Sequence, residues 1–129
     1  MAHYTTFEDL EIYQHSRDIS IIIWGFIKNT SLSKDFALRD QINKSCGSIM
    51  DNIAEGFGRG GNKEFINFLS IARGSCSETR AQLQRAQDRN HITENEYAET
   101  HEKCLELEEQ ISKFINYLKK SERKGSKYD

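Results

Sequence analysis

The sequence predicts an all-α protein folded as an antiparallel, up-down-up-down four-helix bundle. None of its 129 residues is proline and only 8 are glycine, so long helices can run without interruption. Apolar residues recur at spacings of three and four along most of the chain, which is the periodicity of amphipathic helices, and no alternation typical of strands occurs. Short polar segments separate four such stretches, and short connections make consecutive helices antiparallel neighbours.

The first predicted helix covers residues 7–28, with Thr5 or Thr6 as its N-cap. Two neighbouring stripes of mostly apolar residues run along it, which is a wider apolar surface than one neighbour can cover. The first stripe consists of Leu10, Tyr13, Arg17, Ile21, Trp24 and Lys28, and the second of Ile12, Ile19, Ile23, Phe26 and Ile27. We therefore expect this helix to contact more than one partner.

A turn at residues 29–33 precedes the second predicted helix, residues 34–57, for which Ser33 is the expected N-cap. Its inward positions are predicted to be Leu38, Ile42, Ser45, Ile49, Ile53 and Ala54. Four glycines are expected to end it, because glycine adopts the left-handed conformation common at helix C-termini. These are Gly56, Gly58, Gly60 and Gly61.

The third predicted helix covers residues 63–90 and has Asn62 as its expected N-cap. Its inward residues are predicted to be Phe65, Phe68, Leu69, Ala72, Ser75, Cys76, Thr79, Leu83 and Ala86. The fourth covers residues 94–123 and follows a Thr93-x-x-Glu96 capping box. Its inward residues are predicted to be Tyr97, Cys104, Leu105, Ile111, Phe114, Ile115 and Leu118. The domain prediction is one bundle over residues 1–120 and a polar tail at 121–129.

The composition is that of a soluble globular protein, with 36% hydrophobic and 29% charged residues and a formal net charge of −2. A dedicated nucleic-acid binder would be strongly basic. The modest apolar content suggests that partner subunits cover part of the helix surface. The most apolar stretch, residues 19–27, is too short to span a bilayer, and the N-terminus lacks a signal-peptide pattern, so we expect a cytoplasmic protein without membrane contact. Three cysteines without a CxxC pair predict buried, reduced thiols.

Motifs for catalysis or cofactor binding are weak. Gly56-x-Gly58-x-x-Gly61 matches the dinucleotide-binding fingerprint in letters, but that fingerprint requires a preceding strand. A di-iron bundle requires Glu-x-x-His motifs, and no histidine here follows a glutamate at that spacing. His101 and Cys104 share one helix face and supply two ligands at most. The sequence therefore predicts no metal, no cofactor and no catalytic residues, and an enzyme using Glu55 or His101 is the less favoured alternative.

A polar set on the second predicted helix has two open interpretations. Its members recur at spacings of three, four or seven, so they line one helix face. They are Gln41, Ser48, Asn52, Glu55 and Arg59, and the last two flank Gly56 and Gly58. The set is either a structural network or subunit contact, which we favour, or a site that contacts a ligand.

Basic residues gather on the third predicted helix, whereas acidic residues predominate on the fourth. Such asymmetry could attract an anionic partner despite the near-neutral total, although it is also typical of an ordinary salt-bridged surface. For RNA binding, the residues expected to contact phosphates are Lys44, Arg59, Lys63, Arg73 and Arg80.

Four segments carry a resemblance to a known family. They are FEDLEIY at residues 7–13, LRDQI at 38–42, SIMDNIAEGFGR at 48–59 and EFINFLSIARGS at 64–75. Together they resemble the four-helix-bundle proteins encoded in intervening sequences of bacterial 23S ribosomal RNA genes, often labelled S23 ribosomal protein. Where many relatives have an Arg-Arg-Ala type segment, this chain has Asn43-Lys44-Ser45.

The resemblance implies a four-helix protomer in a ring-like homopentamer. The family includes the accessory variability determinant of diversity-generating retroelements, which binds a reverse transcriptase and nucleic acid through a basic surface. Most members have no established activity. We therefore expect a non-enzymatic homo-oligomer that acts as a scaffold or adaptor for a protein partner or RNA. The alternative is an RNA-binding accessory protein related to ribosomal RNA or to retroelements.

Overall fold

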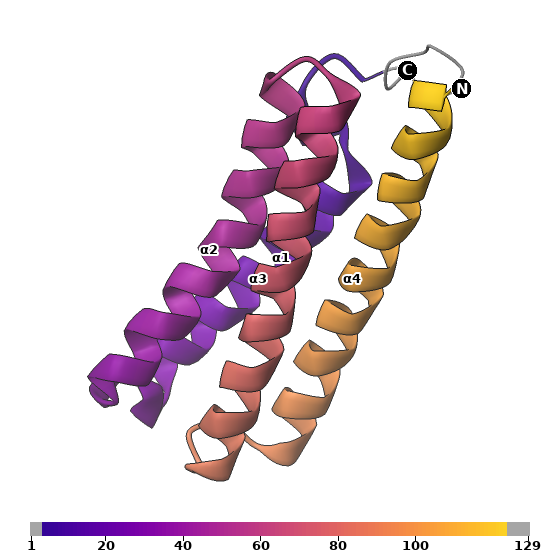
Figure 1. The fold of residues 1–129 in the computed structure, drawn as a ribbon. Helices are drawn as coiled ribbons and strands as arrows, with labels where there is room; N and C mark the ends of the chain where they lie inside the picture. The colour runs from indigo at the N-terminus through magenta and orange to yellow at the C-terminus, as the bar shows by residue number, and fades with distance from the viewer. Residues whose placement is uncertain (1–3, 124–129) are drawn as a thin grey trace.

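A computed structural model describes residues 4–123, which form four long helices and two short 3-10 turns (Figure 1). The helices are α1 (Glu11–Asn29), α2 (Phe36–Gly58), α3 (Asn62–Asp88) and α4 (Glu94–Arg123), and the turns are η1 (Phe7–Asp9) and η2 (Ser31–Lys34). This range contains no strand. The predicted all-α four-helix bundle is confirmed.

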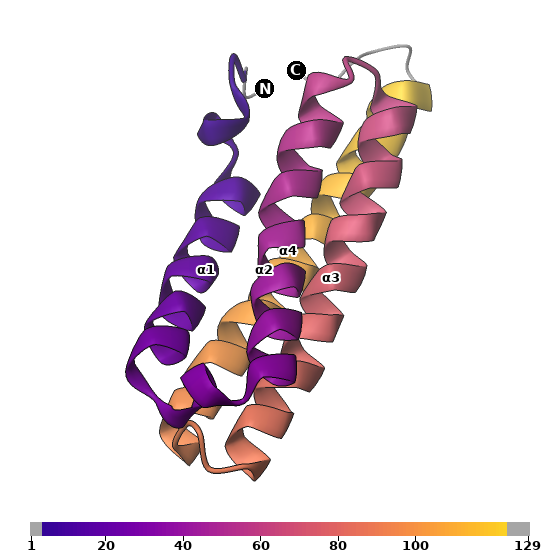
Figure 2. The same cartoon turned by 90° about the vertical axis from the view of Figure 1, so that its left-hand side faces the viewer.

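Successive helices run in opposite directions and pack as neighbours, and α1 also contacts α4, which closes the bundle. Figure 2 shows α1 and α3 on opposite sides, with α2 and α4 between them. No helix within residues 4–123 is both long enough and apolar enough to cross a membrane.

The second predicted stripe of the first helix faces the core. Ile12, Ile19, Ile23 and Ile27 are buried, and Phe26 is half-buried. In the first predicted stripe, Ile21 and Trp24 remain 57% and 50% exposed. The wide apolar surface of α1 is therefore only partly covered by its own bundle.

The inward prediction for Leu105 is wrong. Leu105 is exposed, whereas Leu107 is fully buried between Cys104 and Ile111 at helical spacing. The stretch Leu105-Glu106-Leu107 offers two apolar residues about 200° apart on a helix, so only one of them can face the core.

The predicted capping box of the fourth helix is confirmed. The Thr93 N–H donates to Glu96 Oε1 over 2.8 Å, and the Glu96 N–H donates to Thr93 Oγ1 over 3.0 Å. Two other predicted caps, Ser33 and Asn62, are wrong. Ser33 lies inside η2, and Asp35 precedes α2. Asn62 is the first residue of α3, and its buried Nδ2 donates to the Leu118 carbonyl of α4 over 3.1 Å.

The glycines after the second helix do not all end it, as the sequence had suggested. Gly56 and Gly58 lie within α2, and Gly60, with φ of 86°, takes the left-handed conformation beyond its end. Gly56 is buried where α2 meets α3. A Cβ there would lie 2.7 Å from the Phe68 Cβ and 2.9 Å from Phe65 Cδ1, so only glycine permits this approach.

The first and last helices differ slightly from the prediction at the two ends of the chain. The α-helix begins at Glu11, after η1, where the Asp9 carboxylate accepts bonds from the Thr6 N–H and from Thr5. At the other end α4 continues through Arg123, and Ser121 is buried, so the predicted boundary at residue 120 falls inside the helix. Residues 124–129 of the predicted tail lie outside the described residues.

Candidate functional site

The polar face of α2 packs against α3 along a seam of buried hydrogen bonds. At its centre the Ser45 hydroxyl bonds Thr79 Oγ1 at 2.9 Å and donates to Gln82 Oε1 at 2.5 Å. All three residues are buried. Such groups are costly to bury without partners, so these bonds specify how the two helices meet.

Three residues of the predicted polar set extend this seam. Ser48 bonds Ser75 Oγ at 2.9 Å, and Asn52 Nδ2 donates to the Ser48 carbonyl and hydroxyl at 2.8 and 2.9 Å. At the other end, Arg85 donates to Gln41 Oε1 over 2.9 Å. These contacts favour the structural-network interpretation of Gln41, Ser48 and Asn52.

The remaining two members of the set pair with each other. Arg59 Nε lies 2.9 Å from Glu55 Oε2, and both side chains are about half exposed. The Arg59 guanidinium also stacks on the Phe68 ring, 5.2 Å from its centroid. Glu55 is therefore a half-exposed carboxylate in an i,i+4 ion pair.

A shallow groove of about 340 Å³ follows the seam. Lys44 and Arg85 lie along it together with Glu78, and amides and hydroxyls complete its lining. The mixed charges and open shape do not resemble the enclosed, largely apolar pockets that hold cofactors.

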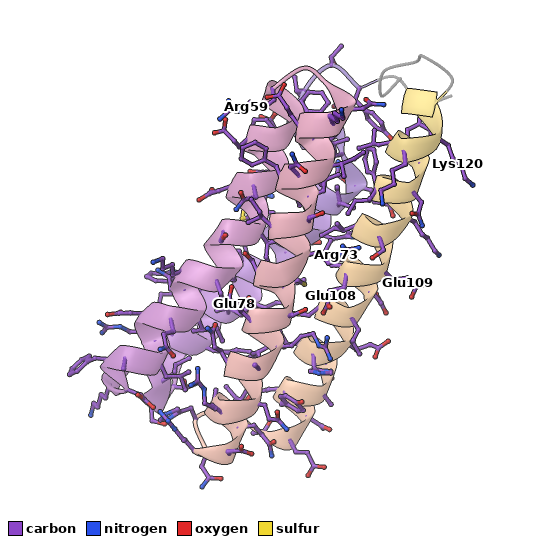
Figure 3. All side chains as sticks on the ribbon, in the orientation of Figure 1. Arg59, Arg73, Glu78, Glu108, Glu109 and Lys120 are labelled. Carbon is purple, nitrogen blue, oxygen red and sulfur yellow. The ribbon has the colours of Figure 1, made fainter. Side chains whose placement is uncertain are left out.

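Two of the five predicted phosphate-contacting residues instead tie α3 to α4. Arg80 NH1 lies 2.9 Å from Glu108 Oε2, and both side chains are largely buried. Arg73 NH1 donates to Ser112 Oγ over 3.0 Å. Figure 3 shows Arg73 and Glu108 on these two neighbouring helices. Lys44 and Lys63 are exposed and form no ion pair with any residue in the described range.

His101 and Cys104 do not meet at a common site. His101 Nε2 accepts a bond from Arg80 Nε over 3.3 Å, whereas Cys104 is buried and its carbonyl accepts from the Cys76 thiol over 3.3 Å. All three cysteines are free and buried, and burial raises the pKa of the Cys46 thiol. Over residues 4–123 no three metal-ligating side chains converge.

A polar cluster that the sequence did not predict joins the two connections at one end of the bundle. His91 Nε2 lies 2.8 Å from Asp35 Oδ2, and His91 Nδ1 lies 2.6 Å from Ser31 Oγ. Arg89 NH1 also binds Asp35 Oδ2, at 2.9 Å. The hydrogen bonds from His91 and Arg89 lower the pKa of Asp35 to about 2.

The order Ser31–His91–Asp35 resembles a catalytic triad in its contacts, but two features of its surroundings differ from one. The next two amides, those of Leu32 and Ser33, both donate to Thr30, so neither is available as an oxyanion-hole donor. Arg89 shares the Asp35 carboxylate that would have to support a charged imidazole. The cluster therefore acts as a tie between the α1–α2 and α3–α4 connections.

Comparison with known proteins decides the family. The profile of the 23S rRNA-intervening sequence protein family matches residues 8–113, which is most of the bundle. The chain belongs to this family. The seam of α2 and α3 and the tie at its end are thus features of a 23S rRNA-intervening sequence family protein.

A solved structure has a similar fold. It is a protein of unknown function from the S23 ribosomal protein family of Bacteroides thetaiotaomicron, with 26% sequence identity and a TM-score of 0.73. The match covers 81% of this chain and 97% of that one. No curated protein matches the chain.

Proposed function

We propose that this 23S rRNA-intervening sequence family protein is a non-enzymatic, homo-oligomeric scaffold. The observation that carries the proposal is an exposed apolar surface on the outer side of α1 and the start of α2. We call this surface the α1 face, and it is centred on Ile21, Trp24 and Phe36. These residues are 57%, 50% and 63% exposed.

Trp24 and Phe36 both lie near Arg39 of α2. Trp24 lines a cleft of about 220 Å³ together with Arg39 and Asn43 of α2, and the Arg39 guanidinium covers the Phe36 ring at 4.9 Å. Ile21 lies one helical turn before Trp24, on the same side of α1. The face therefore spans both helices.

Leaving these side chains in water is unfavourable. Burying one large apolar side chain contributes about 1.5–3 kcal/mol, and tryptophan is among the residues most enriched at binding hot spots. Contiguous exposed apolar surface on a small protein typically marks an interaction site. The resemblance to pentameric relatives favours a second copy of the chain as the partner, in a ring of five.

Native mass spectrometry and sedimentation velocity at micromolar concentration test this proposal. We expect a mass of about five times the 15.0 kDa chain. Trp24→Asp should reduce the measured mass to that of one chain. Ile71→Asp is the matched control, because Ile71 is 51% exposed but lies on α3, outside the α1 face. A wild-type protein that is monomeric at these concentrations contradicts the proposal.

RNA binding is the second candidate, favoured by Lys44, which is exposed and has no ion pair within residues 4–123, beside Arg85 along the α2–α3 groove. A salt titration with a structured ribosomal RNA fragment tests it. Affinity should fall steeply as the salt concentration rises. Lys44→Glu should reduce the slope of log affinity against log salt concentration by about 1. Lys103→Glu, an exposed change of the same charge on α4, is the control. Absence of binding at low salt contradicts this candidate.

A further inference from the structure

We propose that Cys76 and Cys104 are an oxidisable thiol pair, which hydrogen peroxide converts into a disulfide bridge between α3 and α4. This modification site is independent of the proposed self-association. It lies inside the bundle, where the two helices face each other, and the ion pair of Arg80 and Glu108 covers it.

The two cysteines stand opposite each other on antiparallel helices. Near one end of the bundle, Asn62 of α3 donates to the Leu118 carbonyl of α4. Cys76 lies fourteen residues after Asn62, which is close to four helical turns. Cys104 lies the same distance before Leu118. The Cys76 thiol accordingly donates to the Cys104 carbonyl over 3.3 Å, so this register aims Cys76 at Cys104.

The two thiols also contact each other. Both side chains are fully buried. A hydrogen bond with the Cys104 thiol raises the pKa of the Cys76 thiol, and burial raises it further. The third thiol, that of Cys46, instead donates to the Asn43 carbonyl of its own helix over 3.5 Å. The contacts therefore favour Cys76 and Cys104 as the pair that forms a bond.

The Arg80–Glu108 ion pair covers the thiols on the solvent side. Arg80 Nε donates to His101 Nε2 over 3.3 Å, and Arg80 Nη1 donates to Glu108 Oε2 over 2.9 Å. Cys104 lies between these two contacts on α4, three residues after His101 and four before Glu108. The side chains of Arg80 and Glu108 are only 30% and 18% exposed. Arg80 therefore lies across the α3–α4 contact at the level of Cys104.

Oxidation of the pair takes two steps, with hydrogen peroxide as the oxidant. One thiol loses its proton, its sulfur attacks a peroxide oxygen, and the O–O bond breaks to leave a sulfenic acid and one water. The second sulfur attacks the sulfenic sulfur, the S–O bond breaks, and the departing hydroxide takes the second thiol proton as water. Two thiols and one peroxide thus give one disulfide and two waters.

The surroundings of the pair make this reaction slow. The thiolate is the reactive form of cysteine. The raised pKa of Cys76 keeps that thiol protonated at neutral pH, and its burial requires an opening of the α3–α4 contact before peroxide can enter. The pair therefore stays reduced in trace peroxide and responds to sustained oxidation.

Peptide mass spectrometry of the wild-type chain tests the pairing. Reduced protein is treated with hydrogen peroxide, the remaining thiols are alkylated, and the protein is digested without reductant. We expect a linked pair of peptides that carry Cys76 and Cys104, with Cys46 alkylated. Cys46→Ser should give the same link, and Cys76→Ser should give none.

Four outcomes contradict the proposal. They are a link through Cys46, a link between two chains in non-reducing electrophoresis, oxidation that ends at sulfinic acid without a link, and survival of both thiols after prolonged exposure. Circular dichroism checks that each variant is folded, and Cys76→Ala replaces Cys76→Ser if that variant is not.

Matched variants test the cover over the thiols. Arg80→Gln removes the guanidinium beside the pair, whereas Arg73→Gln removes another arginine that ties α3 to α4, through Ser112. The rate of link formation should rise several-fold in Arg80→Gln and stay near the wild-type rate in Arg73→Gln. Equal rates in the two variants contradict the covering role of Arg80.

Urea unfolding tests whether the native packing accommodates the bridge. The link closes a loop of 28 residues and restricts the unfolded chain, so it should stabilise the fold. Peroxide should raise the urea midpoint of the wild type, a reductant should reverse the rise, and the midpoint of Cys76→Ser should not respond. An unchanged or lower midpoint of the linked wild type contradicts the placement of the two thiols.

Discussion

At the scale of single residues, Gly56 shows how closely α2 and α3 approach. We predict that Gly56→Ala lowers the free energy of unfolding by about 1–3 kcal/mol, because its Cβ would lie only 2.7 Å from the Phe68 Cβ. Gly58→Ala is the matched control, since nothing lies within 4 Å of its Cβ position. That change should be neutral or stabilise by up to about 1 kcal/mol through helix propensity. Urea unfolding measures both, and equal effects would contradict the close approach.

Asp35 supplies a second prediction at this scale, on pH dependence. Its pKa falls from 3.8 to about 2 in the folded chain, because His91 and Arg89 bind the carboxylate. The folded state therefore favours the charged form, and this stabilisation is complete above pH 3.8. It decreases as the pH falls from there and is lost below about pH 2.

The test is the difference in unfolding free energy between wild type and Asp35→Asn, measured in urea from pH 6 to pH 2. We expect the wild type to be the more stable at pH 6 and the difference to shrink as the pH falls toward 2. A difference that stays constant over this range would show that the charge on Asp35 does not stabilise the fold.

At the scale of helices, the seam between α2 and α3 rests on Ser45. We predict that Ser45→Ala lowers the free energy of unfolding by about 1–3 kcal/mol, because Thr79 and Gln82 then lose a buried hydrogen-bonding partner. Ser70→Ala, at an exposed position of α3, should change it by less than about 0.5 kcal/mol. Equal stability of the two variants would mean that the seam does not depend on its hydrogen bonds.

The helices themselves could be predicted because their signals are local. The spacing of apolar residues predicted α4 with its observed bounds. The capping box, which spans only the four residues 93–96, marked the start of this helix. The polar set of α2 was also visible as a face. Its partners were not, because Ser48 meets Ser75 27 residues further along the chain.

The wrong cap prediction for Asn62 and the unpredicted cluster of Ser31, His91 and Asp35 share this cause. Asparagine is a residue type common at N-caps, but the side-chain amide of Asn62 donates to the Leu118 carbonyl, 56 residues away. The tie between Ser31, His91 and Asp35 joins two connections that no local pattern relates. Local sequence patterns therefore predict the secondary-structure elements. Tertiary contacts determine which polar side chains form hydrogen bonds between helices.

At the scale of the whole molecule, α1 contributes to the core and also carries the surface on which we propose that copies assemble. Its buried stripe completes the core, while Ile21 and Trp24 on the same helix remain exposed. If assembly covers them, the folded state is stabilised by mass action, and the stability of the protomer depends on its own concentration. A monomer would show no such dependence.

We therefore predict that the thermal midpoint of the wild type rises with protein concentration. A tenfold increase should contribute about 1.4 kcal/mol of free energy for each chain that joins the assembly, which corresponds to roughly 3–6 °C for a chain of this size. The midpoint of Trp24→Asp should not change with concentration, because that variant has lost the α1 face. Calorimetry over a hundredfold concentration range measures both. A wild-type midpoint that stays constant over this range would contradict the proposed self-association.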